Sequence, residues 1–154
     1  LRILSGLYGV LRPLDLIQPY RLEMGTRLNN IKGAHLYAFW GTKLTELLNQ
    51  DSLIQKNNAI INLASEEYSK SIAFASLALP VITPIFQDEK NGEYKMISFY
   101  AKRARGLMAR FLAENQADAV EALLDFNLEG YTYAPEKSAP NKPLFRRASH
   151  WQTQ

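Results

Sequence analysis

The sequence predicts an α/β fold, because strand-like and helical apolar patterns alternate along a chain of 154 residues. Residues 58–65, NAIINLAS, form a near-continuous apolar run with β-branched residues, which is typical of a buried central strand. Residues 81–86 and 94–99 are two further strand-like runs, and the Asn91-Gly92 pair between them is a strong hairpin signal. A helical repeat of apolar residues follows directly. The sequence therefore predicts strands, a hairpin and flanking helices.

The other elements follow in order along the chain. Residues 1–5 are an apolar run typical of a buried strand, and the glycine-rich turn after it is expected to lead into a short helix. Apolar residues recur at helical spacing over 36–48, which predicts one core helix. The remaining expected elements are a short helix capped by Ser65, a helix over 118–128, a strand over 130–133, a loop over 138–143 and a last edge strand over 144–147.

Composition indicates an ordinary globular protein with a net charge of +3. The length suits a single domain over 1–154. The absence of cysteine excludes a disulfide framework and a thiolate metal site. No apolar run reaches the roughly 18 residues of a membrane span, so we expect a cytoplasmic protein with no membrane partner. Because the chain starts at Leu1 in a strand-like pattern, we expect it to be the C-terminal part of a longer protein.

The strongest functional signal is the basic helix predicted over 100–112, YAKRARGLMARFL. At 100° per residue, its four cations and one glycine fall within an arc of roughly 160°, and apolar residues fill the other side. The members of this arc are Lys102, Arg103, Arg105, Gly106 and Arg110. Glycine costs about 1 kcal/mol relative to alanine inside a helix, and its missing side chain would let an anionic partner approach the backbone. The alternative is a solvated basic face with an incidental glycine.

Two other segments place arginines near turns. Arg12 follows a strand and a glycine-rich turn, an arrangement that can present backbone N–H groups to an anion. A simple tight turn is favoured there, because the phosphate-loop spacings are absent. Arg21 and Glu23 would share one side of an extended segment, where they are expected to pair with each other. Asp88 and Lys90 are expected to be solvated residues near the hairpin turn.

A polar cluster is expected where the strand over 58–65 ends. Asn62 is a polar amide inside an apolar run, and it is expected to find partners in the core rather than a ligand. Ser65, Glu67 and Tyr68 follow it at the carboxyl end of the strand, where open α/β sheets bind ligands.

Metal and catalytic motifs are absent from the sequence. His35 and His150 are the two histidines, and neither an HExxH nor a GxSxG pattern occurs. We therefore expect no cofactor and no tightly bound metal. Acid–base chemistry could use Glu23, Glu67 or Asp88, but no spacing selects a pair, and the sequence favours a protein that is not an enzyme.

Seven segments along the chain carry a resemblance to a known family. They are SGLYGVLRPLD (5–15), PYRLEMG (19–25), FWG (39–41), INLASEEY (61–68), DEKNG (88–92), ISFYAKRARGLMARF (97–111) and GY (130–131). Together these motifs resemble the YaaA family of bacterial proteins associated with the peroxide stress response, and the resemblance covers nearly the whole chain. It implies a mixed α/β fold of unusual topology, with a positively charged cleft that binds DNA, and a role in limiting peroxide damage by keeping unincorporated iron low. It also implies that family members extend further at the N-terminus, with a helix-hairpin-helix-like element.

Three hypotheses follow. The first is a cytoplasmic, non-enzymatic stress protein that binds double-stranded or structured DNA without sequence specificity. Its phosphate contacts would be Lys102, Arg103, Arg105 and Arg110, aided by Arg12, Arg21, Lys70 and Lys90. The second is an enzyme for a phosphorylated or nucleotide-like small molecule, with Asn62, Ser65, Glu67 and Tyr68 facing Arg12, Asp15, Arg21 and Glu23 across a cleft. The third is a basic helix that docks on an acidic partner protein.

Overall fold

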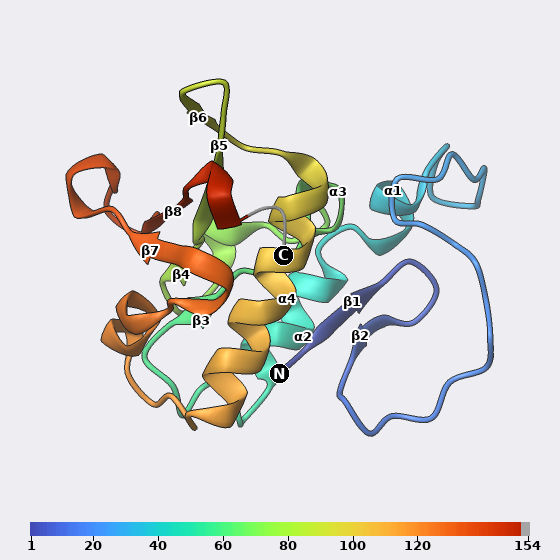
Figure 1. Cartoon of the computed structure of the whole chain (residues 1–154). Coiled ribbons are helices and arrows are strands. Elements are labelled where there is room, and N and C mark those ends of the chain that lie inside the picture. The colour runs from blue at the N-terminus through green and yellow to red at the C-terminus, as the bar shows by residue number, and fades with distance from the viewer. Residues whose placement is uncertain (152–154) are drawn as a thin grey trace. The chain divides into compact units, whose positions relative to one another are not determined.

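The computed structural model of the chain has the predicted mixed α/β fold, with helices and short strands interspersed along the sequence (Figure 1). The structure describes residues 1–151. Among these residues, no helix has both the length and the apolar character needed to cross a membrane.

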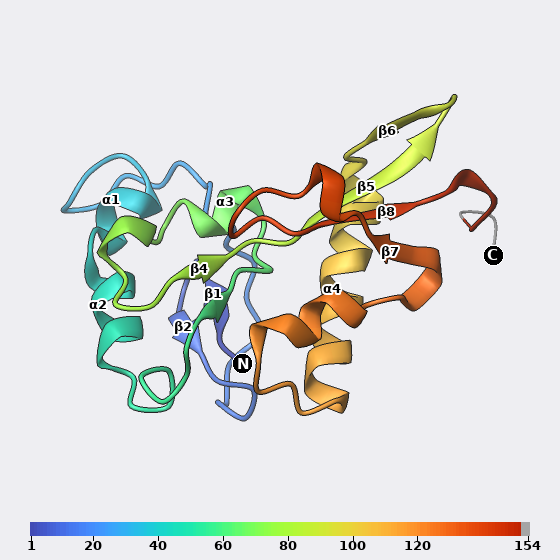
Figure 2. The same cartoon turned by 90° about the vertical axis from the view of Figure 1, so that its left-hand side faces the viewer.

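Helix α4 (Ser98–Glu114) is the longest element, and it lies along one face of a four-stranded sheet (Figure 2). The strand order is β6-β5-β8-β7. The sheet is mixed, because β8 runs parallel to β5 and antiparallel to β7. The four strands are β5 (Ile85–Lys90), β6 (Glu93–Lys95), β7 (Tyr131–Tyr133) and β8 (Leu144–Arg147).

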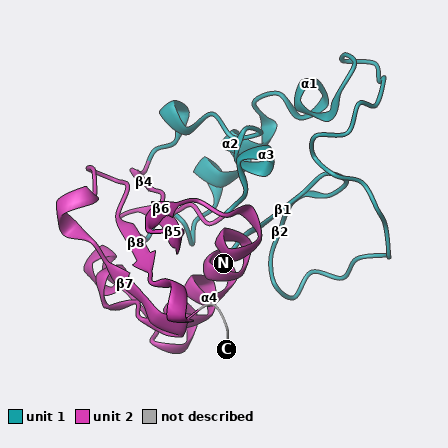
Figure 3. Cartoon of the chain, turned by 45° about the horizontal axis from the view of Figure 1, so that its top comes forward, with its two compact units in different colours: residues 1–56, 64–78 teal, residues 57–63, 79–154 magenta. Residues whose placement is uncertain are grey.

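The chain forms two compact units (Figure 3). Unit 1 comprises residues 1–56 and 64–78, and unit 2 comprises residues 57–63 and the chain from residue 79 onward. Unit 2 contains the four-stranded sheet and α4. That the two units make up a single domain, as the sequence predicts, stays a prediction.

Unit 1 contains a two-stranded hairpin and three short α-helices. The antiparallel strands are β1 (Ile3–Ser5) and β2 (Gly9–Leu11), and Gly9 adopts the positive φ of 77° that the turn requires. The expected short helix after this turn is therefore wrong, because the chain returns as a second strand. The helices are α1 (Leu36–Trp40), α2 (Lys43–Gln50) and α3 (Glu66–Ser69). The buried core of unit 1 consists of Met24, Leu36, Leu44, Leu48 and Ile72.

The helix predicted over 36–48 is divided into α1 and α2 at Gly41. Gly41 has φ 53° and ends α1, and its N–H donates to the Tyr37 carbonyl oxygen. At the other end of α1, the His35 Nδ1 atom accepts a hydrogen bond from the Ala38 N–H at 3.1 Å. The helical spacing of the apolar residues continues across the break, which is why the sequence predicts a single helix.

The core of unit 2 lies between α4 and the sheet. The side chains of Phe86 and Phe145 stack with their ring centroids 5.6 Å apart, and Ala104 and Met108 of α4 pack in the same buried cluster. Strand β8 lies between two other strands and is largely buried, so the prediction of an edge strand over 144–147 is wrong.

The hairpin signal at Asn91-Gly92 is confirmed. These residues have φ of 55° and 77°, as a tight primed turn requires, and they join β5 to β6. The strand-like run over 94–99 is shorter than predicted, because β6 ends at Lys95 and α4 begins at Ser98.

The apolar run over 58–65 contributes only β3 (Ile60–Ile61), which pairs in parallel with β4 (Val81–Ile82) in a separate two-stranded sheet. Its prediction as a central strand is therefore wrong. Residues 120–125 form a 3-10 helix inside the region predicted as an α-helix. The 3-10 helices are η1 (Phe74–Ser76), η2 (Val120–Asp125), η3 (Leu128–Gly130), η4 (Pro135–Lys137) and η5 (Ser149–Trp151).

Candidate functional site

Helix α4 presents a basic face on the side opposite to the sheet. Ala101, Ala104 and Met108 are buried on its inner side. The predicted separation of basic and apolar sides is therefore present in the structure. The side turned away from the sheet, which we call the α4 face, is formed by the exposed residues Phe99, Lys102, Arg103, Gly106 and Arg110 and, at its margin, by the partly buried Arg105.

Gly106 leaves the α4 face open at its middle. A Cβ atom added at this position would meet no heavy atom within 4 Å. The glycine is therefore not needed for close packing inside the chain, although it costs about 1 kcal/mol of helix stability relative to alanine. The open backbone at Gly106 is accessible to an external partner.

Two of the four α4 cations are ion-paired within the chain. Arg103 Nε donates to both carboxylate oxygens of Glu129, at 2.7 and 2.8 Å, and its Nη2 also bonds to that carboxylate. These hydrogen bonds raise the pKa of Arg103 and lower the pKa of Glu129. Arg110 Nε lies 2.7 Å from Glu114 Oε1, one helical turn further along.

The other two cations have no such carboxylate. Within residues 1–151, neither Lys102 nor Arg105 forms an ion pair. Lys102 is exposed, whereas Arg105 is partly buried, and this burial lowers the pKa of its guanidinium. These two side chains are the α4 cations with no internal competitor for an anion.

A buried ion pair lies under the α4 face. Arg147 Nε of β8 donates to Asp88 Oδ1 of β5 at 2.6 Å, and the two side chains are 4% and 0% exposed. The Tyr131 hydroxyl donates to the same carboxylate at 3.0 Å. The Arg147 guanidinium lies between the rings of Tyr100 and Tyr131, 4.7 Å from each centroid. Asp88 is therefore not a solvated turn residue, and that prediction is wrong.

The buried pair connects to the surface through Glu129. Arg147 Nη1 lies 3.7 Å from Glu129 Oε2, and Glu129 in turn binds Arg103. Asp88, Arg147, Glu129 and Arg103 thus alternate in charge from the core to the α4 face. Glu129 has φ 52°, a left-handed conformation that is unfavourable for residues other than glycine. Among the described residues, Arg147 Nη2 is a buried donor without a hydrogen-bond partner.

The predicted cations outside α4 occupy varied environments. Arg12 lies 3.5 Å from Asp15, whose carboxylate also accepts the Arg12 N–H at 2.8 Å. Lys70 pairs with Glu66 at 3.0 Å. Arg21 is exposed in unit 1, and in the described chain it forms no ion pair with Glu23, contrary to the expected pairing. Lys90 is exposed at the end of β5 in unit 2. A common cleft for these cations and α4 stays a prediction.

The predicted polar cluster is partly assembled within unit 1. Glu67 Oε1 accepts the Gly25 N–H at 2.7 Å, and Ser65 Oγ caps α3 by accepting the Tyr68 N–H. Burial raises the pKa of the Tyr68 hydroxyl, and the negative charges of Glu67 and Glu23 raise it further. Glu23, Glu67 and Tyr68 are therefore within electrostatic reach of one another.

Asn62 belongs to unit 2 and not to this cluster. Its Nδ2 donates to Thr83 Oγ1 at 3.3 Å, across the short β3–β4 pair. Asn62 thus has a hydrogen-bond partner within the protein, as the sequence predicts for a polar amide in an apolar strand.

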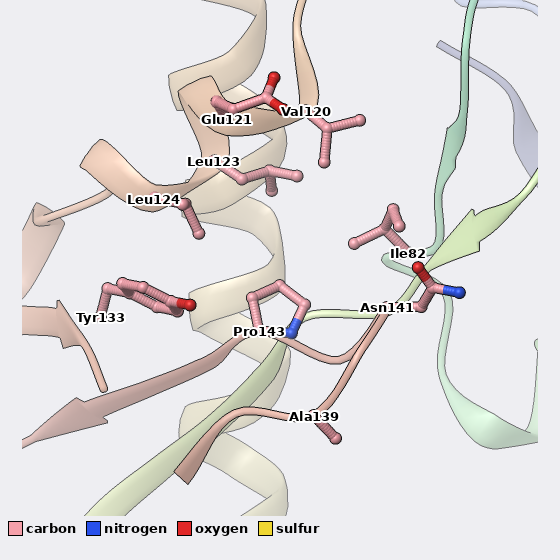
Figure 4. Close-up of a pocket in the computed structure, with 9 residues that line it drawn as sticks. All are labelled: Ile82, Val120, Glu121, Leu123, Leu124, Tyr133, Ala139, Asn141 and Pro143. Atoms are coloured by element: carbon pink, nitrogen blue, oxygen red, sulfur yellow. The ribbon is translucent and has the colours of Figure 1, made fainter. Parts of the chain in front are cut away.

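A small hollow of about 230 Å³ lies in unit 2 between η2 and the segment that leads into β8 (Figure 4). Its lining is mainly apolar, and the charged group among its lining residues is the carboxylate of Glu121. This chemistry suits an apolar group better than a phosphate. The residues that line it are Ile82, Val120, Glu121, Leu123, Leu124, Tyr133, Ala139, Asn141 and Pro143.

No group of three or more histidine and acidic side chains that could hold a metal ion occurs within residues 1–151. His35 contributes the helix cap described above.

The sequence reasoning missed three residues of the network under α4, namely Asp88, Glu129 and Arg147. A signal existed for two of them. Residues two apart in a strand point to the same face, so Asp88 shares the buried face of Phe86, and Arg147 shares that of Phe145. Glu129 lies in a turn 26 residues from its partner Arg103, and no local spacing indicates the pair.

The fold and the α4 face define a mixed α/β protein with one exposed basic helix. A family model described as peroxide stress protein YaaA matches residues 1–137. The chain therefore belongs to this family of peroxide stress proteins.

Two curated relatives match nearly the whole chain. A UPF0246 protein of Tolumonas auensis is 62% identical over 147 residues, which are 96% of this chain and 56% of the relative. A UPF0246 protein of Shewanella denitrificans is 57% identical over 147 residues, which are 96% of this chain and 57% of the relative. The chain thus spans a little over half the length of these relatives.

Proposed function

We propose that this chain is a DNA-binding protein of the peroxide stress response and that it contacts DNA phosphates through the α4 face. The observation that carries the proposal is the open backbone at Gly106 beside Lys102 and Arg105, two cations without an internal carboxylate partner. Fixed cations along one helix attract a polyanion, and the absent side chain permits close approach.

The four α4 cations contribute unequally to this contact. Lys102 and Arg105 are available directly. Arg110 is in an exposed pair with Glu114 at a spacing of four residues, and such pairs contribute only about 0.5 kcal/mol, so a phosphate replaces the carboxylate readily. Arg103 is held by the carboxylate of Glu129 through several hydrogen bonds and is the least available. Arg12, Arg21, Lys70 and Lys90 supply supporting contacts.

Contacts of this kind read the backbone and not the bases, so the protein binds double-stranded or structured DNA without sequence specificity. The family description supplies the physiological setting, which is peroxide stress. In this proposal the protein acts in the cytoplasm, where it helps to limit iron-dependent oxidative damage to DNA, and it needs no cofactor.

A salt titration of duplex binding tests the proposal. The slope of log K against log salt is negative, and each phosphate contact removed makes it shallower by about 0.9. Lys102→Ala and Arg105→Ala should each make the slope shallower by this amount, with equal effect for unrelated duplex sequences. Lys43→Ala is the matched control, because Lys43 of α2 lies outside the proposed contact set. An equal loss of slope in all three variants counts against the α4 face.

A second candidate function is catalysis on a phosphorylated or nucleotide-like small molecule. It is favoured by the proximity of Glu23, Glu67 and Tyr68 in unit 1. Glu23→Gln separates the two functions. If this variant keeps its DNA affinity but no longer protects cells from peroxide, binding alone is not the function. If neither property changes, the acidic side chain has no catalytic role.

A further inference from the structure

Phe99 is an exposed aromatic side chain on the α4 face. It is 75% exposed, although it lies in the first turn of a long and well-packed helix. Gly106 follows it by seven residues, so both point to the same side of the helix, and Lys102 and Arg103 flank that side. Met96, just before α4, is also exposed, at 67%.

The Phe99 ring contacts the ring of Tyr100 on one side. Its centroid lies 5.8 Å from that of Tyr100, with the two rings at 65° to each other. The Tyr100 ring lies in turn against the Arg147 guanidinium, which the buried Asp88 fixes in place. Phe99 therefore packs on a side chain that contacts the buried ion pair of unit 2, and most of its own surface is open to solvent. Its apolar surface contributes nothing to the core.

The neighbouring charges select the kind of partner that this ring fits. A purely apolar surface placed on Phe99 would remove water from Lys102 without offering a negative charge, which is unfavourable. A nucleic acid offers phosphates for the cations together with the flat faces of its bases for the ring. In a fully paired duplex the base faces are stacked and hidden, whereas unpaired bases leave them accessible.

We infer that Phe99 is a stacking residue that makes the α4 face prefer nucleic acid with unpaired bases over fully paired duplex. The inference rests on the proposed function, because Lys102, Arg105 and Arg110 hold the phosphates in both cases. Phe99 adds a contact that only an accessible base can make. Recognition remains independent of sequence, since every base has an aromatic face.

The test compares a DNA single strand with the blunt duplex formed from the same strand, at one salt concentration, by fluorescence anisotropy. The wild-type chain should bind the single strand more tightly. Phe99→Ala should weaken single-strand binding about tenfold, equivalent to about 1.4 kcal/mol, which lies in the range known for stacking of one base on an aromatic side chain. Its duplex affinity should change less than twofold. Phe99→Trp should retain the preference, because it keeps an aromatic face.

The controls separate this inference from the proposed function. Lys102→Ala should weaken binding of both probes and make the slope of log K against log salt shallower. Thermal melting of each variant verifies that it is folded. If Phe99→Ala weakens both probes equally, or neither, the stacking role is wrong even though duplex binding persists. A lowered Tm with unchanged single-strand affinity would assign Phe99 to protein packing and also overturn the inference. If the wild-type chain binds neither probe in a salt-dependent way, the proposed function fails together with the inference.

Discussion

Asp88 and Arg147 occupy directly opposed positions on the parallel strands β5 and β8, with Asp88 Oδ1 2.6 Å from Arg147 Nε. Tyr131 faces Arg147 from the other side, on β7, and donates its hydroxyl hydrogen to the same carboxylate. One buried ion pair thus links the three strands that lie under α4. Arg147 also supports Tyr100 of α4, so this pair holds the first turn of α4 in place on the sheet.

Replacing Asp88 by asparagine should destabilise the protein strongly. The change leaves the buried Arg147 charge without its directly hydrogen-bonded carboxylate, with only Glu129 at 3.7 Å as a remaining acidic neighbour. Removing one partner of a buried ion pair costs about 3–5 kcal/mol. Urea denaturation measures the loss. A second substitution, Arg147→Met, should recover much of it, because the uncompensated charge is then absent. The control is Glu66→Gln, which removes the exposed pair with Lys70 and should cost no more than about 0.5 kcal/mol. If Asp88→Asn lowers the free energy of unfolding no more than this control does, the buried Asp88–Arg147 pair does not hold the sheet together as described.

Glu129→Gln should increase DNA affinity. The substitution removes the negative charge that competes for Arg103, so that this cation becomes available to a phosphate. We expect the duplex salt slope to steepen by about 0.9, the value for one added phosphate contact. Glu114→Gln is the comparison variant, because it releases Arg110 on the same helix. Weaker duplex binding by a folded Glu129→Gln protein would show that Glu129 supports the interface instead of competing with it.

The Glu129 carboxylate makes the stability of the fold depend on pH. Hydrogen bonds from Arg103 lower the pKa of Glu129 below its ordinary value of 4.5. The pKa of Glu129 is thus lower in the folded protein than in the unfolded chain. The Arg103–Glu129 ion pair therefore stabilises the fold fully at pH values above 4.5, and this stabilisation is lost as the pH falls through the folded-state pKa of Glu129. The stability difference between the wild type and Glu129→Gln should therefore shrink on acidification. Urea denaturation of both proteins at neutral pH and at about pH 3 measures it. A difference that is equal at both pH values would mean that the carboxylate is not ion-paired in solution.

Gly106→Ala should make the protein more stable and bind DNA less well. The added Cβ meets no atom within 4 Å, so the substitution gains about 1 kcal/mol of helix propensity without a clash. The same methyl group occupies the space through which DNA approaches the backbone. Thermal melting and duplex titration measure the two effects. Gly130→Ala is the opposite control, since Gly130 has φ 78° and its Cβ would overlap the Trp151 ring, and it should destabilise. If Gly106→Ala binds duplex as well as the wild type does, close approach at Gly106 is not required.

The sequence predicts correctly those elements that are determined by residues close together along the chain. The Asn91-Gly92 turn and the two-sided helix over 100–112 depend on neighbouring residues, and both are present. The sequence predicts a strand at Leu144–Arg147 but not its place in the sheet, because the position between β5 and β7 depends on pairing with residues far away in the sequence. Asp88 is expected in solvent from the sequence because it lies near the predicted hairpin turn at Asn91-Gly92. Strand alternation places Asp88 on the buried face of Phe86, but its partner Arg147 lies 59 residues later, and no local pattern reveals that pair.

In the candidate site, too, the sequence predicts features set by neighbouring residues but not those set by distant contacts. The sequence located the four α4 cations and the open glycine between them. It could not show that Arg103 binds Glu129, because that pair depends on where the turn at 128–130 folds against α4. Whether a side chain on a helix is free to bind a ligand is decided by such tertiary contacts, and only the structure distinguishes Lys102 and Arg105 from Arg103.

The most direct test of the account is the salt dependence of duplex binding by the wild-type chain and by a variant in which Lys102, Arg105 and Arg110 are all alanine. If α4 holds the phosphates, the slope of log K against log salt should be shallower in the variant by about 2.7, the value for three lost contacts. Equal slopes in the two proteins would contradict the proposal that this helix is the DNA-binding surface.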